Sequence, residues 1–75
     1  MTEHFPSLSA RQIVHVLEQL GFLFVRQHGS HAFYRHPETR RTTSVPMHSG
    51  DIKRGVVMGI VKQTGVSREE FFALV

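Results

Sequence analysis

Histidine, arginine and aromatic side chains are concentrated in one short stretch of this 75-residue chain, from Val25 to Pro37. The stretch holds three imidazoles, two guanidiniums and two aromatic rings around a single glycine. An imidazole gives or takes a proton near neutral pH, and a guanidinium binds phosphate. These residue types therefore predict acid–base chemistry on an anionic substrate. The first candidate is His31, which lies between Arg26 and Arg35 in the sequence.

Two strands joined by a glycine turn are expected to hold these side chains, over about 22–28 and 31–36. Side chains alternate between the two faces of a strand, so His31, Phe33 and Arg35 should share one face of the second strand. Both faces of the first strand are apolar. Its periodicity therefore does not decide which face meets the rest of the protein.

A third, polar strand is expected over 41–45, where Pro46 ends it at an edge of the sheet. The sheet is thus predicted to be a three-stranded antiparallel meander. Residues 47–51 contain turn formers without periodicity and predict a loop that leads to a second helix.

Helices are expected on both sides of these strands. Ser9 and Gln12 have the spacing of a capping box, followed by an apolar stripe that Gly21 ends. A second helix is predicted over 54–64, with its buried stripe formed by Val57, Ile60, Val61 and Thr64. Its Gly55 and Gly59 predict a close approach of another element. Gly65 should end this helix, and Ser67 should cap a short C-terminal helix that carries Phe71.

The order helix, strand, strand, strand, helix predicts an α+β fold of the double-stranded-RNA-binding type, with a short C-terminal helix. We interpret residues 1–75 as a single domain in which 1–8 form a leader. The chain has no cysteine and no apolar run long enough to cross a membrane, which favours a cytoplasmic protein.

Charge is distributed unevenly along the chain. Between residues 26 and 62 there are seven basic and two acidic side chains, a net charge of +5, whereas the remaining ends carry −2. This asymmetry predicts a basic surface for phosphate or for an acidic protein.

Several segments together resemble the HicA mRNA interferase toxins, from about Ser9 to Phe72. The most specific part is Arg26 to His31 combined with the downstream helix bounded by glycines. The segments that carry the resemblance are Gly21-Phe22, Val25-Arg26-Gln27, Gly29-Ser30-His31, Arg35-His36-Pro37, Val45-Pro46, His48-Ser49-Gly50, Lys53-Arg54-Gly55 and Ile60 to Ser67.

The resemblance implies a bacterial toxin that cleaves mRNA, depends on the histidine of its glycine-serine-histidine motif, and is covered by a HicB antitoxin. Here that histidine is His31. RNA cleavage without a metal needs one group to take the 2′-hydroxyl proton, one to protonate the departing oxygen, and cations for the phosphate. Either His28 or His48 is a candidate for the second proton carrier. The residues expected to contact RNA are Arg26, Ser30, Arg35, Lys53 and Arg54.

No cofactor or metal is expected, because no histidine pair has the helical spacing of a zinc site and no cysteine is present. Two other interpretations remain open at this point. One is a noncatalytic RNA-binding module that uses the same basic face, and the other is a structural protein whose basic face binds an acidic partner. An oligomer is compatible with a toxin–antitoxin complex.

Overall fold

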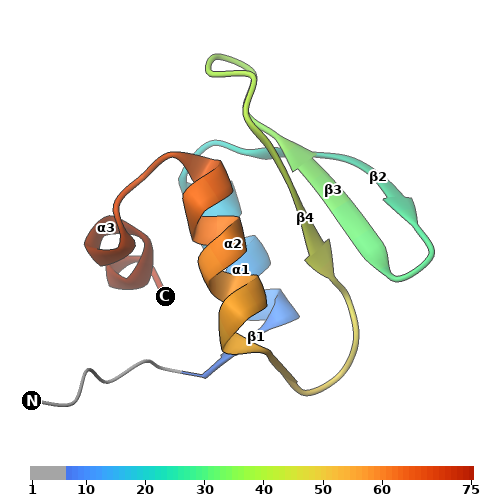
Figure 1. The fold of residues 1–75 in the computed structure, drawn as a ribbon. Coiled ribbons are helices and arrows are strands. Elements are labelled where there is room, and N and C mark those ends of the chain that lie inside the picture. Colours follow the sequence, from blue (N-terminus) through green and yellow to red (C-terminus); the bar gives the residue numbers. More distant parts are fainter. Residues whose placement is uncertain (1–6) are drawn as a thin grey trace, which may run out of the picture.

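A computed structural model describes residues 7–75 (Figure 1). Two helices pack on one face of a three-stranded antiparallel sheet, and a short third helix lies beside the second, which confirms the predicted α+β fold. The elements, in chain order, are β1 Leu8–Ser9, α1 Ala10–Gln19, β2 Leu23–His28, β3 His31–Arg35, β4 Thr42–Pro46, β5 Asp51–Ile52, α2 Arg54–Thr64 and α3 Arg68–Ala73.

The predicted capping box begins α1. The Ser9 hydroxyl accepts a hydrogen bond from the Gln12 N–H at 3.2 Å, and the Gln12 side-chain oxygen accepts from the Ser9 N–H at 2.9 Å. These bonds satisfy two backbone donors that a helix start otherwise leaves unpaired. The predicted apolar stripe of this helix is buried at Ile13, Val16 and Leu17.

The sheet has the order β2–β3–β4, so β3 is central. One face is buried against the helices through Ala32, Tyr34, Thr43 and Val45. Burial raises the pKa of the Tyr34 hydroxyl above its ordinary value, and the Glu18 carboxylate raises it further.

The opposite face of the sheet, here called the open face, consists of exposed or half-buried residues. On β3 it presents His31, Phe33 and Arg35, as the strand alternation predicted. Their cross-strand partners on β2 and β4, which share this face, are Leu23, Arg26, His28, Thr42, Ser44 and Pro46.

All of β2 is exposed, although its first half is apolar. Leu23, Phe24 and Val25 are 60%, 57% and 53% exposed, and the pairing with β3 is irregular between Phe24 and Arg26. Figure 1 shows why: the β2–β3 hairpin projects to the side of the molecule, away from α1 and α2. The helices cover β3 and β4, so neither face of β2 reaches the core.

The second helix, α2, has the predicted bounds and the predicted buried stripe. Gly65 caps its C-terminus in the left-handed conformation, with φ of 84°, where glycine is favoured. The prediction for Gly55 and Gly59 is wrong. A Cβ atom at either position would meet nothing within 4 Å, because both glycines lie on the solvent side of the helix.

A second, two-stranded sheet was not predicted. β1 pairs antiparallel with β5, and Leu8 lies opposite Ile52. Both side chains are buried. The leader expected over 1–8 falls mainly outside the described residues, but its last residue belongs to the core. Likewise, the predicted loop 47–51 ends one residue earlier, because Asp51 begins β5.

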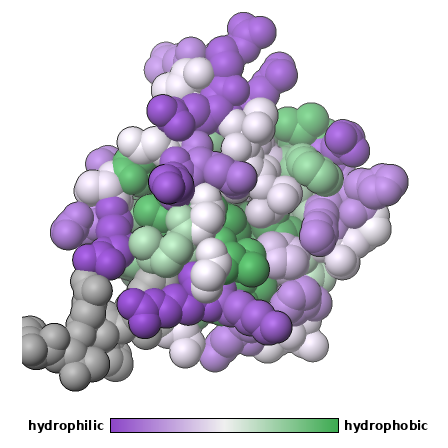
Figure 2. Space-filling model, viewed as in Figure 1, coloured by the Kyte–Doolittle hydropathy of each residue, from purple (hydrophilic) through white to green (hydrophobic). Residues whose placement is uncertain are grey.

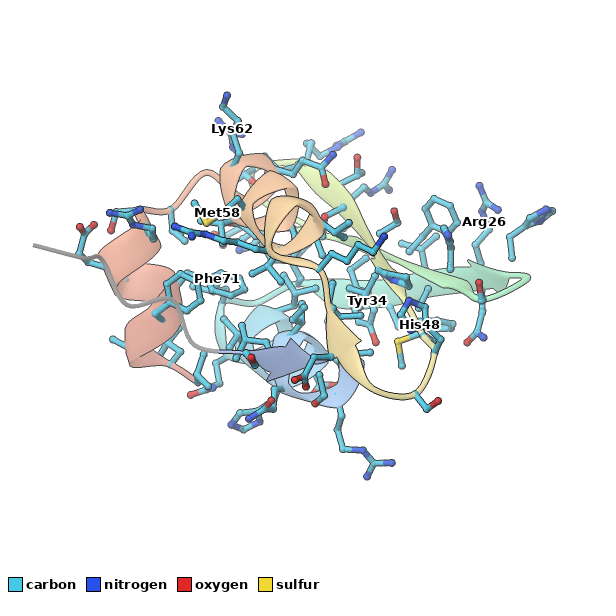
Figure 3. All side chains as sticks on the ribbon, turned by 60° about the horizontal axis from the view of Figure 1, so that its bottom comes forward. Arg26, Tyr34, His48, Met58, Lys62 and Phe71 are labelled. Carbon is cyan, nitrogen blue, oxygen red and sulfur yellow. The ribbon has the colours of Figure 1, made fainter. Side chains whose placement is uncertain are left out.

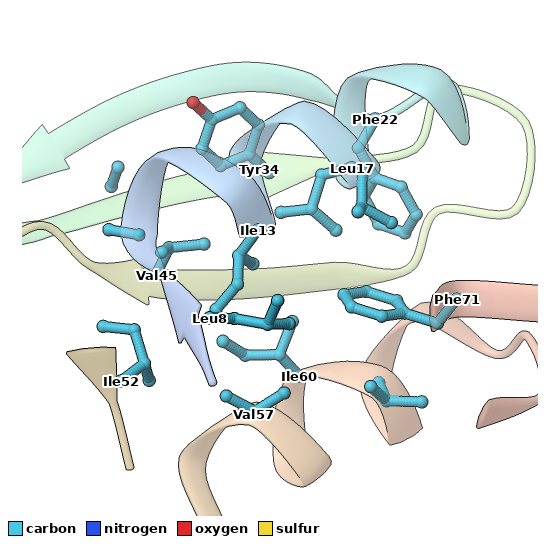
Figure 4. Packing of buried hydrophobic residues seen from close by; sticks show 14 residues of the cluster. Leu8, Ile13, Leu17, Phe22, Tyr34, Val45, Ile52, Val57, Ile60 and Phe71 are labelled. Atoms are coloured by element: carbon cyan, nitrogen blue, oxygen red, sulfur yellow. The ribbon is translucent and has the colours of Figure 1, made fainter. Parts of the chain in front are cut away.

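The core lies between the sheet and the helices, where Leu8, Ile13, Val45, Val57 and Phe71 meet (Figure 4). Phe71 reaches it from α3, whose first turn is capped by the Ser67 hydroxyl as predicted. Figure 2 shows hydrophilic side chains gathered over the β3–β4 turn at the top, with apolar surface over α2. None of the helices in the described part of the chain could span a membrane.

Candidate active site

The β2–β3 hairpin closes through a two-residue turn, Gly29–Ser30, that places His28 directly opposite His31. Gly29 has a φ of 61°, which matches the position where type II′ hairpin turns use glycine. Directly opposed residues have Cβ atoms about 4.5–5.5 Å apart. The Cβ atoms of His28 and His31 are therefore neighbours on the open face.

A backbone hydrogen bond ties this turn to the loop that follows β4. The Met47 N–H donates to the Ser30 carbonyl oxygen at 2.5 Å. His31 also lies opposite Pro46 in the β3–β4 ladder. These two constraints hold the start of the loop next to the hairpin, so His48, labelled in Figure 3, is brought to the same end of the sheet as His31.

A groove of 390 Å³ lies at this end of the sheet, between the open face and the first turn of α2. Three of the predicted site residues, His31, His48 and Lys53, line it together. They come from β3, from the loop after β4 and from the N-cap position of α2. The groove therefore holds two imidazoles and an ammonium group, although these residues are far apart in the sequence.

One ring nitrogen of His48 contacts a backbone carbonyl group. Its Nδ1 lies 3.2 Å from the carbonyl oxygen of Ser49. A carbonyl oxygen can only accept, so this contact assigns the hydrogen to Nδ1. In the neutral ring, Nε2 is then left as a proton acceptor. In this tautomer, a neutral His48 ring can act as a general base through Nε2.

None of the three predicted arginines lines the groove, and two of them, Arg26 and Arg35, lie on the open face. Arg26 is opposite Phe33, with its guanidinium carbon 4.6 Å from the ring centroid. Arg35 is four residues from His31 on the same strand, about 13 Å at the usual rise of a strand. Arg35 accordingly does not line the groove beside His31. Arg54 occupies the first position of α2, next to Lys53.

Sequence reasoning missed several residues of the groove. Asp51 and Val56 line it beside Lys53, and Ser44 lines it from β4. Asp51 reaches the groove because β5 pairs with β1, and a two-residue strand has no sequence signal of its own. Phe33 was placed on the correct face but given no role, although its contact with Arg26 makes it part of the surface beside His31.

The His36 side chain is held by hydrogen bonds and by packing within the fold. Its Nδ1 accepts hydrogen bonds from the Glu38 and Thr39 N–H groups at 3.1 and 3.3 Å, and its ring meets Phe22 edge-on at 5.3 Å. The ring thereby orders the β3–β4 turn. It lies beyond the end of β3, away from the groove. Among the residues that the structure describes, no group of three or more His, Cys, Asp or Glu side chains is arranged to hold a metal ion.

Comparison with known proteins identifies one family. The family described as the HicA toxin of bacterial toxin–antitoxin systems matches residues 10–66. This range contains all the strands of the three-stranded sheet, the groove and every predicted site residue, and it ends just after α2. No curated protein matches the chain.

Proposed function

This chain belongs to the HicA toxin family of bacterial toxin–antitoxin systems, and we propose that it acts as a metal-independent endoribonuclease that cleaves mRNA at the groove beside His31. The observation that carries the proposal is the groove itself. It combines His31, His48 and Lys53, which supply two proton-transfer groups and a cation. We also propose that the toxin acts in the cytoplasm, where its mRNA substrate is found.

In the proposed reaction, Nε2 of His48 takes the proton of a ribose 2′-hydroxyl. The 2′-oxygen then attacks the adjacent phosphorus, and the bond from phosphorus to the 5′-oxygen breaks. His31, in its protonated form, donates a proton to that departing oxygen. The products are a 2′,3′-cyclic phosphate and a 5′-hydroxyl. Each correctly placed acid or base contributes on the order of 100- to 10,000-fold to such a reaction.

The position of His48 favours it over His28 as the second proton carrier. In an in-line displacement the attacking and departing oxygens lie on opposite sides of phosphorus, so the base and the acid must flank the phosphate. His31 and His48 line the same groove, and in this proposal the phosphate binds there between them. His28 is instead the lateral neighbour of His31 in the hairpin. We therefore assign His28 to contact with the RNA backbone.

Cations around the groove bind the rest of the RNA in this proposal. Lys53 faces the phosphate that reacts, and it stabilises the charge that develops there. Arg26 and Arg35 are placed along the open face, where they meet neighbouring phosphates. Ser30 at the hairpin turn and Arg54 in α2 extend this contact surface on either side of the groove.

The proposal is tested by incubating the purified protein with a defined single-stranded RNA in EDTA. We expect cleavage, with a 2′,3′-cyclic phosphate at the new 3′ end. The matched control is the same RNA with a single 2′-deoxyribose at the cleaved position, which removes the nucleophile and should stay intact there. Tight binding without any cleavage would instead favour the noncatalytic RNA-binding module.

We further propose that a HicB-type antitoxin inhibits by covering the groove. The net charge of +5 between residues 26 and 62 favours rapid association with an acidic partner. RNA and antitoxin should then exclude one another. Titration of antitoxin into a complex of labelled RNA with the His31→Ala protein tests this, because a stable ternary complex would place the antitoxin on another surface.

A further inference from the structure

Phe33 occupies the middle of the open face, on the central strand. It lies opposite Arg26 on β2 and Ser44 on β4. The hydrophobic core is on the other face of the sheet, beneath Ala32 and Tyr34. Phe33 is only half-buried, and with the Arg26 side chain over its ring it lies on the side of the sheet that carries His31.

Arg26 and Phe33 are in contact and together present an aromatic ring and a cation on the open face. The guanidinium carbon of Arg26 lies 4.6 Å from the centroid of the Phe33 ring, within the range of a cation–π contact. Aromatic rings and guanidinium planes are the groups on which proteins stack unpaired nucleobases. The contact also holds Arg26 in place, which reduces the entropy lost when a ligand binds it.

The distance from Phe33 to His31 is similar to the distance between neighbouring nucleotides in an RNA strand. Phe33 and His31 are two residues apart on the same face of β3, about 7 Å at the rise of a strand. A base of the nucleotide next to the reacting phosphate would therefore reach Phe33. A paired base is stacked between its neighbours in a duplex, and it cannot present its face to a protein surface in this way.

We propose that Phe33 and Arg26 form a stacking platform for one unpaired nucleobase of the substrate, adjacent to the phosphate at His31. The proposal rests on the proposed function and specifies its substrate as single-stranded RNA. It departs from what the fold class suggests, since double-stranded-RNA-binding domains read the shape and 2′-hydroxyls of a duplex.

The test measures the affinity of a fluorescent single-stranded RNA for the inactive His31→Ala protein, so that no cleavage is needed. In this background Phe33→Leu removes the aromatic plane and keeps an apolar side chain, whereas Phe33→Tyr keeps the plane. We expect Phe33→Leu to weaken binding roughly tenfold and Phe33→Tyr to bind like the parent. Thermal unfolding of each variant verifies that it is folded.

A series of RNAs, each with one abasic nucleotide, identifies the stacked base without changing the protein. One abasic position should lower the affinity of the parent for RNA roughly tenfold. The same abasic RNA should bind the Phe33→Leu variant almost as tightly as the intact RNA does. The same RNA annealed to its complement should bind both proteins alike. Three results would overturn the platform. The parent and Phe33→Leu could bind the single strand with equal affinity, or neither protein could bind RNA. Alternatively, every abasic position could weaken binding by the same factor in Phe33→Leu as in the parent.

These outcomes are distinct from failure of the proposed function. If the wild-type protein does not cleave RNA but binding depends on Phe33 as described, the platform stands and the nuclease assignment is wrong. If the wild-type protein cleaves RNA and Phe33→Leu binds it unchanged, the nuclease assignment stands and the platform is wrong.

Discussion

The histidines of the described residues differ in what surrounds them, and this separates their roles. His31 and His48 line one groove. His15 is exposed on α1. The His36 ring accepts two backbone hydrogen bonds and packs on Phe22. Chemistry is therefore expected from the histidines of the groove, and a contribution to stability is expected from His36.

Replacing His36 by alanine should destabilise the fold without affecting the proposed chemistry. The change removes the acceptor of two backbone N–H groups, each worth about 0.5–1.5 kcal/mol, and we expect a loss of about 1–3 kcal/mol in the free energy of unfolding. Urea denaturation measures this loss. His15→Ala is the matched control and should change stability by less than about 0.5 kcal/mol. Equal stability of both variants would contradict the structural role of His36.

At the scale of elements, the helices were predictable from sequence because each has a local signal. The Ser9 and Gln12 spacing located the start of α1, and Gly65 located the end of α2. The pair of strands β1 and β5 has no such signal, since it consists of two residues on each side. That pair positions Asp51 at the groove, so part of the candidate site could not be foreseen.

The exposure of β2 could also not be predicted from the sequence. The first half of β2 has apolar residues on both faces, so its sequence does not show which face is buried. Leu23, Phe24 and Val25 are all exposed because the hairpin projects beyond the helices. An apolar edge strand with unpaired backbone groups is prone to pair with other chains. The free toxin is therefore expected to associate with itself through β2.

A lysine at this edge should suppress that association. Val25 is 53% exposed on β2, so Val25→Lys adds charge without opening the core, and it should lower the concentration-dependent increase in mass seen by sedimentation velocity. Val75→Lys provides the control, because Val75 is similarly exposed but lies outside any strand. If both substitutions change association equally, the edge of β2 is not responsible.

At the scale of the whole molecule, charge counts showed an excess of basic residues in the middle of the chain, but they could not show where each of those residues lies. The structure separates Lys53 at the groove from Arg26 and Arg35 along the open face. Lys62, in the last turn of α2, lies far from Arg26 (Figure 3). The basic residues of the middle segment are thus not equivalent, although their charge is the same.

Removing Arg26 and Arg35 together should flatten the dependence of RNA affinity on salt. Each lost phosphate contact lowers the slope of log affinity against log salt by roughly 0.7 for a single strand, so the double Arg→Gln variant should lose roughly 1.4. Lys62→Gln is the control and should keep the wild-type slope. A double variant with an unchanged slope would place the RNA on a different surface.

The most direct test of the account is the rate of RNA cleavage in EDTA by the wild-type, His31→Ala and His36→Ala proteins, measured with enzyme in excess and corrected for the folded fraction. Loss of an acid–base group predicts that His31→Ala is at least about 100-fold slower while still binding RNA. His36→Ala should cleave at the wild-type rate. Cleavage by His31→Ala at the wild-type rate would contradict the assignment of the active site.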